Sequence, residues 1–290
     1  MSLNKPYAVS VVIPTYNREA FIEESVESAL SQRLDAKQRA VEVIVIDDGS
    51  SDNTSKIIKK FGNKIRYRRI NNSGKPAVVR NIGVQMAKGE LIAFLDSDDK
   101  WLPNRLSSQM KYFSEPSVAL ASANAYKIDQ DGCLLNETIL PVGKKYGHNP
   151  LQELILDNYI CTLTVLARRD AILAAGGFNE SLALNEDYAL WLRLAAHGKF
   201  IYSPVPIALY RIHADNITNL KNMGVQRAME AVYRAIKDGF DAGDYSKEYR
   251  KLYLARLANL SRQLEGLDPK HKTTWKIQNF KYRLLLKTHN

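Results

Sequence analysis

The sequence predicts an α/β fold, with a Rossmann-like, mainly parallel central sheet flanked by helices and a helical C-terminal extension. Three observations lead to this expectation. Runs of strand length alternate with helix-spaced apolar residues over residues 8–95, as in parallel sheets covered on both faces. The length of 290 residues suits one large domain with an appendage. Helix-spaced apolar residues then continue beyond residue 222 without a further strand signal.

The first part of the chain is expected to alternate strictly between strands and helices. Strands are predicted at 8–13, 41–46, 64–69 and 91–95, most of them β-branched runs. Helices are predicted between them at 22–30, 53–61 and 76–86. Ligands of such sheets bind beyond the carboxyl ends of the strands. The polar clusters that follow the strands are therefore the first candidates for a site.

The remaining elements are less regular. Strands are predicted at 118–128, 162–167, 199–203 and 207–211, and helices at 103–113, 169–175 and 186–197. Three further helices are expected to contain 225–236, 249–264 and 275–286.

The charge of the chain is high and unevenly distributed. There are 41 Lys and Arg against 31 Asp and Glu, a formal net charge of +10. Residues 221–290 hold 15 of the basic and 7 of the acidic residues, so the body before them is nearly neutral. Basicity indicates an anionic partner, such as nucleic acid, a membrane surface or a phosphorylated small molecule.

Several protein classes are excluded by what the sequence lacks. No run approaches the roughly 18 apolar residues that cross a bilayer, and the N-terminus has no signal-peptide core. Cys133 and Cys161 are typical of free thiols in a reducing compartment. Without a G-x-G-x-x-G or P-loop motif, dinucleotide and P-loop enzymes are disfavoured. The expected location is the cytoplasm, either free or peripheral on the inner face of the plasma membrane.

The segment Asp96-Ser97-Asp98-Asp99 holds three carboxylates directly after a predicted strand. Such crowding is unfavourable unless a cation lies among the carboxylates, and oxygen ligands suit Mg²⁺ or Mn²⁺ shared with substrate phosphates. The alternative is a solvated turn that caps the next helix. The position after the 91–95 strand favours the metal.

Three more polar groups are candidates, each with a structural alternative. Asp48 follows a strand and could accept hydrogen bonds from a base or ribose, or its segment could be an N-cap box for the next helix. Arg80 could neutralise a phosphate or steady that carboxylate, or it could be an ordinary surface residue. Asp187 begins a helix, where acidic residues are expected anyway, but it could also deprotonate a hydroxyl. Arg211 and His213 follow a strand and could close over a diphosphate or metal.

Taken together, these residues resemble glycosyltransferase family 2, the GT-A-fold family of inverting, nucleotide-sugar-dependent transferases. The resemblance covers most of residues 7–218 in the family's order and spacing. The matching stretches are Val9–Ala20, Glu42–Thr54, Ser73–Gly83, Gly89–Asp99, Asn185–Leu194 and, more weakly, Tyr210–Thr218. The resemblance implies a GT-A catalytic domain over 1–219, in which about 1–99 binds the nucleotide sugar and 100–219 the acceptor. Residues 220–290 form a basic α-helical extension outside it.

The resemblance also implies roles for individual residues. On the donor side, the base and ribose would be bound by Pro14, Thr15, Asn17, Asp48 and Asp96, with Arg80 in support. Asp98 would bind the metal, Mn²⁺ or Mg²⁺, with Asp99 and His213 as the further candidate ligands. His213, together with Arg211, would also help close the site over the diphosphate and metal. Asp187, in the family's E-D motif, would be the catalytic base.

The reaction implied is one in-line displacement that moves a sugar from a nucleotide-diphosphate sugar to a hydroxyl of a glycan or lipid-linked acceptor. A UDP-sugar is the expected donor, and envelope polysaccharide synthesis the expected setting. The helix reads Leu190-Trp191-Leu192-Arg193-Leu194 instead of the Q-x-x-R-W of processive synthases, which favours addition of one sugar or a few.

Alternatives stay open at this point. The chain could be a catalytically inactive nucleotide-sugar-binding or scaffold protein of the same fold, and nucleic-acid binding is disfavoured because no recognition motif is visible. The extension could pack on the body, form a homodimer or contact a membrane. The base, sugar, acceptor and linkage are not readable from the sequence.

Overall fold

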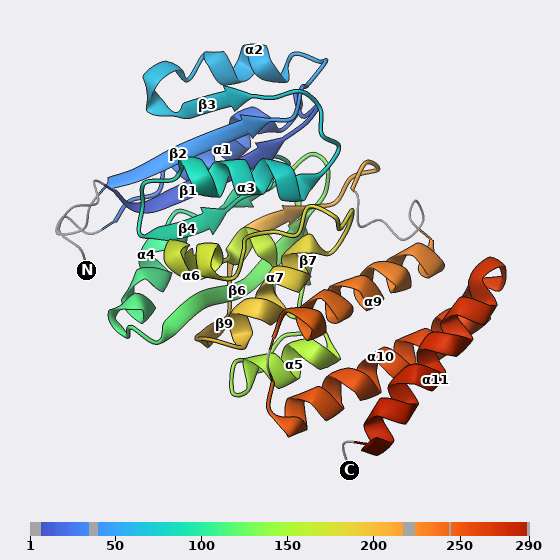
Figure 1. Cartoon of the computed structure of the whole chain (residues 1–290). Helices are drawn as coiled ribbons and strands as arrows, with labels where there is room; N and C mark the ends of the chain where they lie inside the picture. The colour runs from blue at the N-terminus through green and yellow to red at the C-terminus, as the bar shows by residue number, and fades with distance from the viewer. Residues whose placement is uncertain (1–6, 35–39, 217–223, 244, 289–290) are drawn as a thin grey trace.

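The computed structural model describes residues 7–34, 40–216, 224–243 and 245–288. In this part of the chain a nine-stranded sheet has the order β3-β2-β1-β4-β8-β6-β9-β5, with β7 paired to β6 (Figure 1). The strands are β1 (Tyr7–Thr15), β2 (Ala40–Asp47), β3 (Arg66–Arg69), β4 (Leu91–Phe94), β5 (Lys100–Trp101), β6 (Val118–Ile128), β7 (Leu134–Thr138), β8 (Leu166–Arg168) and β9 (Lys199–Arg211).

The α-helices include seven in the body and three in the extension, among the described residues. They are α1 (Ile22–Leu30), α2 (Thr54–Lys59), α3 (Pro76–Met86), α4 (Arg105–Met110), α5 (Pro150–Leu156), α6 (Arg169–Ala174), α7 (Glu186–Ala195), α9 (Val225–Ala242), α10 (Lys247–Leu267) and α11 (Lys272–Thr288). The predicted α/β fold with a helical extension is confirmed.

The first four strands place the polar clusters at one edge of the sheet. β1, β2, β3 and β4 pair in parallel, and Thr15 is in register with Asp47, which is in register with Arg69. The loops after these strands therefore emerge side by side, as ligand-binding loops of such sheets do.

Both faces of the parallel sheet are buried, and alternate residues face opposite sides. Val11 and Ile13 contribute to the core beneath α1, whereas Val12 contributes to the core beneath α3 and α7. α3 lies close to the sheet because Gly83 has no side chain: a Cβ there would lie 2.3 Å from Val12 Cγ1. This approach fixes α3, and with it Arg80, against the strands.

The second half of the sheet is mixed, and several elements differ from expectation. β8 is antiparallel to β4 and β6, while β9 is parallel to β6. The strands expected at 199–203 and 207–211 are one strand, β9, whose register shifts where Asn124 meets Pro206; proline cannot donate to the ladder, so a bulge forms there. The strand expected at 162–167 begins as a 3₁₀ turn, Thr162–Thr164, before β8.

The C-terminal helices share the apolar core of the body. α9 packs on α7, where Gly239 faces Leu192, and the Tyr249 hydroxyl of α10 donates to Asn149 Oδ1 at 3.0 Å, just before α5. α11 packs against α10 and is the outermost helix in Figure 1. No described helix is both long and apolar enough to span a bilayer. The boundary expected at 219/220, Ile217 and Thr218 of the weaker match, and the first six residues lie outside the described residues.

Candidate functional site

The loop after β1 is tied to the loop after β2. Asn17 has a left-handed backbone, with φ of 49°, and its Oδ1 accepts from Ser51 N at 2.8 Å. The Thr15 carbonyl accepts from Asp48 N at 2.8 Å, and Thr15 Oγ1 is buried with no hydrogen-bond partner in the described structure. Pro14 and Asn17 are half-buried at this edge.

Asp48 shapes the loop that follows β3. Its Oδ1 accepts from Ser73 N at 2.8 Å, and its Oδ2 accepts from Gly74 N at 3.0 Å and Ser73 Oγ at 3.1 Å. Gly49, with φ of 78°, packs so closely that a Cβ would lie 2.8 Å from Asn72 N. The carboxylate expected to meet the base is therefore buried, and both of its oxygens already accept hydrogen bonds from the loop after β3.

Arg80 joins two parts of the chain that are far apart in sequence. The buried guanidinium donates to Asp96 Oδ1 at 2.8 Å and to Glu186 Oε1. Burial, helped by the negative charge of Asp187, raises the pKa of Glu186 to about 7, although the charge of Arg80 opposes this shift. One cation thus connects the acidic turn after β4 to the start of α7.

Asp98 is held by two nitrogen donors. Its Oδ2 lies 3.1 Å from Arg18 Nε and 3.1 Å from His213 Nε2. Because His213 Nδ1 accepts from Asp215 N at 3.2 Å, the neutral ring has its proton on Nε2 and donates to Asp98. Burial favours the neutral acid, but the His213 hydrogen bond and the Arg18 charge outweigh it and hold the pKa of Asp98 below its usual value.

Asp99 and Arg211 lie behind the acidic turn. Asp99 is 1% exposed; its Oδ1 accepts from Arg211 N at 2.8 Å, and its Oδ2 is buried without a partner in the part of the chain described. Burial, then the charges of Asp98 and Asp96, raise the pKa of Asp99 well above its usual value. The Arg211 guanidinium donates to Asp98 O at 2.8 Å and to Glu24 Oε2 at 2.7 Å. The structure therefore separates the half-buried Asp96 and Asp98 from these two inward residues.

Asp187 is half-buried at the N-terminus of α7. Its Oδ2 accepts from Thr162 Oγ1 at 2.5 Å and its Oδ1 from Tyr188 N at 2.7 Å. Its neighbour Glu186 is bound to Arg80. Asp187 lies close enough to the acidic turn for its charge to help raise the pKa of Asp96.

The donor atoms suit a cation that is shared with a substrate. Within the described ranges, no group of three or more His, Cys, Asp or Glu is arranged to hold a metal by itself. Mg²⁺ and Mn²⁺ commonly take one or two carboxylates and fill their remaining positions with water and phosphate oxygens. Asp98 fits such a site. His213 could bind the cation through Nε2 only in the other neutral tautomer, with its proton on Nδ1, and the hydrogen bond from Asp215 N would then be lost. In the tautomer with its proton on Nε2, His213 orients Asp98 by its hydrogen bond.

Three groups of the site carry no strong signal in the sequence. Arg18 and Thr162 contact the two carboxylates expected to do chemistry, but an Arg after a turn and a Thr in an apolar segment are ordinary residues. The third group is Ser73, whose amide donates to the Asp48 carboxylate, as does the amide of the next residue, Gly74. Their contacts become visible only in the three-dimensional structure.

A sequence model described as Glycosyl transferase family 2 matches residues 10–172, more than half of the chain. The chain belongs to glycosyl transferase family 2. The matched family 2 segment contains the loops after β1 and β2, Arg80 and the acidic turn, whereas Asp187, Arg211 and His213 lie beyond it.

Individual relatives agree with the family 2 assignment. The UDP-Glc:alpha-D-GlcNAc-diphosphoundecaprenol beta-1,3-glucosyltransferase WfaP of Escherichia coli is 35% identical over 218 residues, covering 72% of this chain and 79% of WfaP. An uncharacterized glycosyltransferase of Rickettsia bellii (strain RML369-C) is 34% identical over 212 residues, covering 72% of this chain. This chain spans 29% of the length of that relative.

Solved structures share the fold of this family 2 chain. S. aureus TarS 1-349 matches with a TM-score of 0.70 at 20% identity, covering 95% of this chain and 79% of that one; it has also been solved with UDP-GlcNAc. The mannosyltransferase PcManGT from Pyrobaculum calidifontis, in complex with GDP-Man and Mn²⁺, matches with a TM-score of 0.60 at 16% identity, covering 99% and 85%. The predicted GT-A fold is confirmed.

Proposed function

We propose that the protein transfers a sugar from a nucleotide-diphosphate sugar to a hydroxyl of a glycan or lipid-linked acceptor, with inversion, in envelope polysaccharide synthesis. One observation carries the proposal: the buried Arg80 guanidinium bonds both Asp96, in the acidic turn, and Glu186, the neighbour of Asp187. The carboxylate that would meet the donor and the carboxylate that would act as the base are thus linked through one buried cation.

On the donor side, Pro14, Thr15, Asn17 and Asp48 would line the nucleotide pocket, and Asp96 would meet the ribose. A UDP-sugar is the favoured donor because WfaP is named for UDP-Glc and TarS has been solved with UDP-GlcNAc. Because PcManGT has been solved with GDP-Man, GDP-sugars are the alternative donors to compare with UDP-sugars.

Asp98 would hold Mn²⁺ or Mg²⁺, and such a cation neutralises charge on the departing diphosphate. His213 and Arg18 keep the Asp98 carboxylate ionised and oriented until the donor arrives. Arg211 and Asp99 act through the turn, since Arg211 binds the Asp98 carbonyl and the Asp99 carboxylate binds the Arg211 amide.

Asp187 would take the proton from the acceptor hydroxyl as the acceptor oxygen bonds to the anomeric carbon. The bond from that carbon to the diphosphate breaks on the opposite face, so one displacement inverts the centre. Thr162 would orient the carboxylate by its hydrogen bond.

A thermal-shift screen of UDP, GDP and their sugars, with and without Mn²⁺, tests the donor side, because a ligand that binds only the native state raises the Tm. At least one nucleotide is expected to raise the Tm in a Mn²⁺-dependent way, and Asp98→Asn is expected to remove the Mn²⁺ dependence. Asp131→Asn, at an exposed loop position, is the control. A screen in which no nucleotide binds would overturn the proposal.

Slow hydrolysis of the bound nucleotide sugar separates an enzyme from an inactive binding protein. We expect release of the nucleoside diphosphate above the rate without protein. Tight binding with no release in any condition would instead favour the scaffold alternative.

A further inference from the structure

The outward face of α11 is apolar in its centre and cationic at its edges. Ile277, Phe280 and Leu284 are 61%, 69% and 51% exposed. Their spacing of three and four residues puts them on one face of the helix. The opposite face is buried, since Tyr282 is 3% exposed and its hydroxyl lies 2.8 Å from that of Tyr233. Packing within the protein therefore leaves the apolar stripe uncovered.

Cations surround this stripe. The exposed Lys276, Lys281, Arg283 and Lys287 each lie three or four residues from one of its apolar members. The sequence has no Asp or Glu after Asp268. Within the described residues, none of these four cations forms an ion pair with an acidic side chain.

We propose that this face, formed by Ile277, Phe280, Leu284 and the four surrounding cations, docks the protein on an anionic lipid surface. Apolar side chains enter the boundary between headgroups and acyl chains, while Lys and Arg contact anionic headgroups; amphipathic helices that lie on membranes combine both features. The proposal goes beyond the transfer reaction and does not depend on it.

A second copy of the chain is a poorer occupant. A two-fold contact through this face would bring the same cations of both copies together around the stripe, and like charges at an interface are costly. An anionic membrane complements both the charge and the apolar stripe. The position of α11 on the outside of the molecule leaves the face accessible (Figure 1).

Co-sedimentation of the full chain with vesicles tests the proposal. The wild type is expected to bind vesicles of equal parts phosphatidylcholine and phosphatidylglycerol, to bind phosphatidylcholine alone weakly, and to be released by salt. The triple variant Ile277→Ser, Phe280→Ser, Leu284→Ser should bind about tenfold more weakly, and Lys276→Glu, Lys281→Glu, Lys287→Glu at least as weakly.

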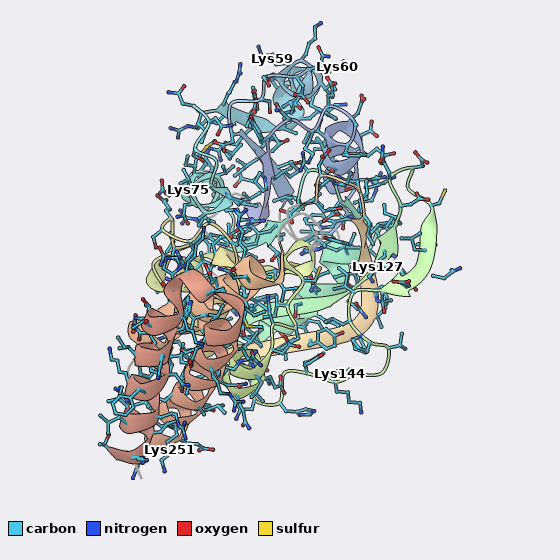
Figure 2. The ribbon with its side chains drawn as sticks, turned by 90° about the vertical axis from the view of Figure 1, so that its right-hand side faces the viewer. Lys59, Lys60, Lys75, Lys127, Lys144 and Lys251 are labelled. Carbon is cyan, nitrogen blue, oxygen red and sulfur yellow. The ribbon has the colours of Figure 1, made fainter. Side chains whose placement is uncertain are left out.

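Matched controls test whether binding depends on this face in particular, and not on the net charge or the exposed apolar surface of the protein in general. The variant Lys56→Glu, Lys59→Glu, Lys60→Glu makes the same charge change on α2 and its C-cap; Lys59 and Lys60 lie at the opposite end of the molecule in Figure 2. Leu134→Ser with Val142→Ser removes apolar groups that are 57% and 87% exposed elsewhere. Both controls should bind as the wild type does.

The outcomes distinguish this proposal from that of the transfer reaction. Unchanged Tm and donor hydrolysis in the α11 variants, with lost vesicle binding, supports the docking face. No wild-type binding to the anionic vesicles, equal loss in the α2 variant, or a lipid-free dimer that the α11 serine variant dissociates would each overturn it.

Discussion

At the strand ends, Arg80, Asp96 and Glu186 are paired with one another, whereas on α11 Lys276, Lys281 and their neighbours stand exposed with no acidic residue nearby in the sequence. Buried charges are stable only when paired, and pairing fixes their positions. Exposed cations that lack partners keep the freedom to meet an external anion. A buried cation thus fixes the positions of the carboxylates around it in one region, whereas exposed cations are free to attract an external anion in the other.

The largest effect is expected from Asp187→Asn. A positioned base contributes roughly 10²–10⁴ in rate, so transfer should fall about a thousandfold while affinity for UDP with Mn²⁺ stays within about twofold. Initial rates with a lipid-linked acceptor and calorimetry with UDP measure the two. Asp170→Asn is the matched control, because Asp170 also lies in a helix first turn and accepts from the next amide. Retained transfer would contradict the role of base.

Leu257→Ala tests whether the extension is energetically part of the body. Leu257 is fully buried in the core that continues into α7, and such truncations cost about 3 kcal/mol. Urea unfolding followed by fluorescence and circular dichroism should show one shifted transition. Leu267→Ala, on the same helix but 39% exposed, should change stability by less than about 0.5 kcal/mol. An earlier, separate transition for the extension would refute the shared core.

Glu186→Gln tests the paired network through its pH dependence. The pKa of Glu186 is raised from 4.5 to about 7 in the folded protein, so the folded state binds more protons than the unfolded state between these values. Stability contributed by this group is therefore present at low pH and is lost as pH rises. Relative to Glu186→Gln, the wild type should lose about 3 kcal/mol between pH 4.5 and 7. Parallel stability curves for the two proteins would argue against the raised pKa.

The smallest effect is expected from Lys281→Ala in the absence of lipid. An exposed cation without an acidic partner contributes little to folding, so the free energy of unfolding should change by less than about 0.5 kcal/mol. Urea midpoints measure this change. A loss above about 1 kcal/mol would mean that the charge is paired within the protein.

The fold was largely predictable because periodicity and strand length carry the information for a parallel sheet. Adjacency of the loops after β1, β2 and β4 follows directly, since their carboxyl ends share an edge. The strand pairings in the second half of the sheet were harder to predict from the sequence. β5 is only two residues long, and most residues of β7 are exposed to solvent. Neither strand therefore produces a clear apolar run in the sequence.

Within the acidic turn, composition could not distinguish the three carboxylates. Asp96 and Asp98 are half-buried at the sheet edge, whereas Asp99 is buried behind the turn. Which side chain points outward depends on the backbone dihedrals of a four-residue turn and on Arg211, a residue more than a hundred positions away. The roles given to individual residues remain predictions for the experiments above.

The left-handed backbones in three neighbouring loops have a consequence for redesign. Asn17, Gly49 and Gly74 have φ of 49°, 78° and 62°, and a side chain at Gly49 would collide with the Asn72 backbone. Loops swapped in from other transferases must reproduce these conformations, because the hydrogen bonds that join the three loops would otherwise be lost. Exchanging side chains on the existing loops is therefore the safer route to a different donor.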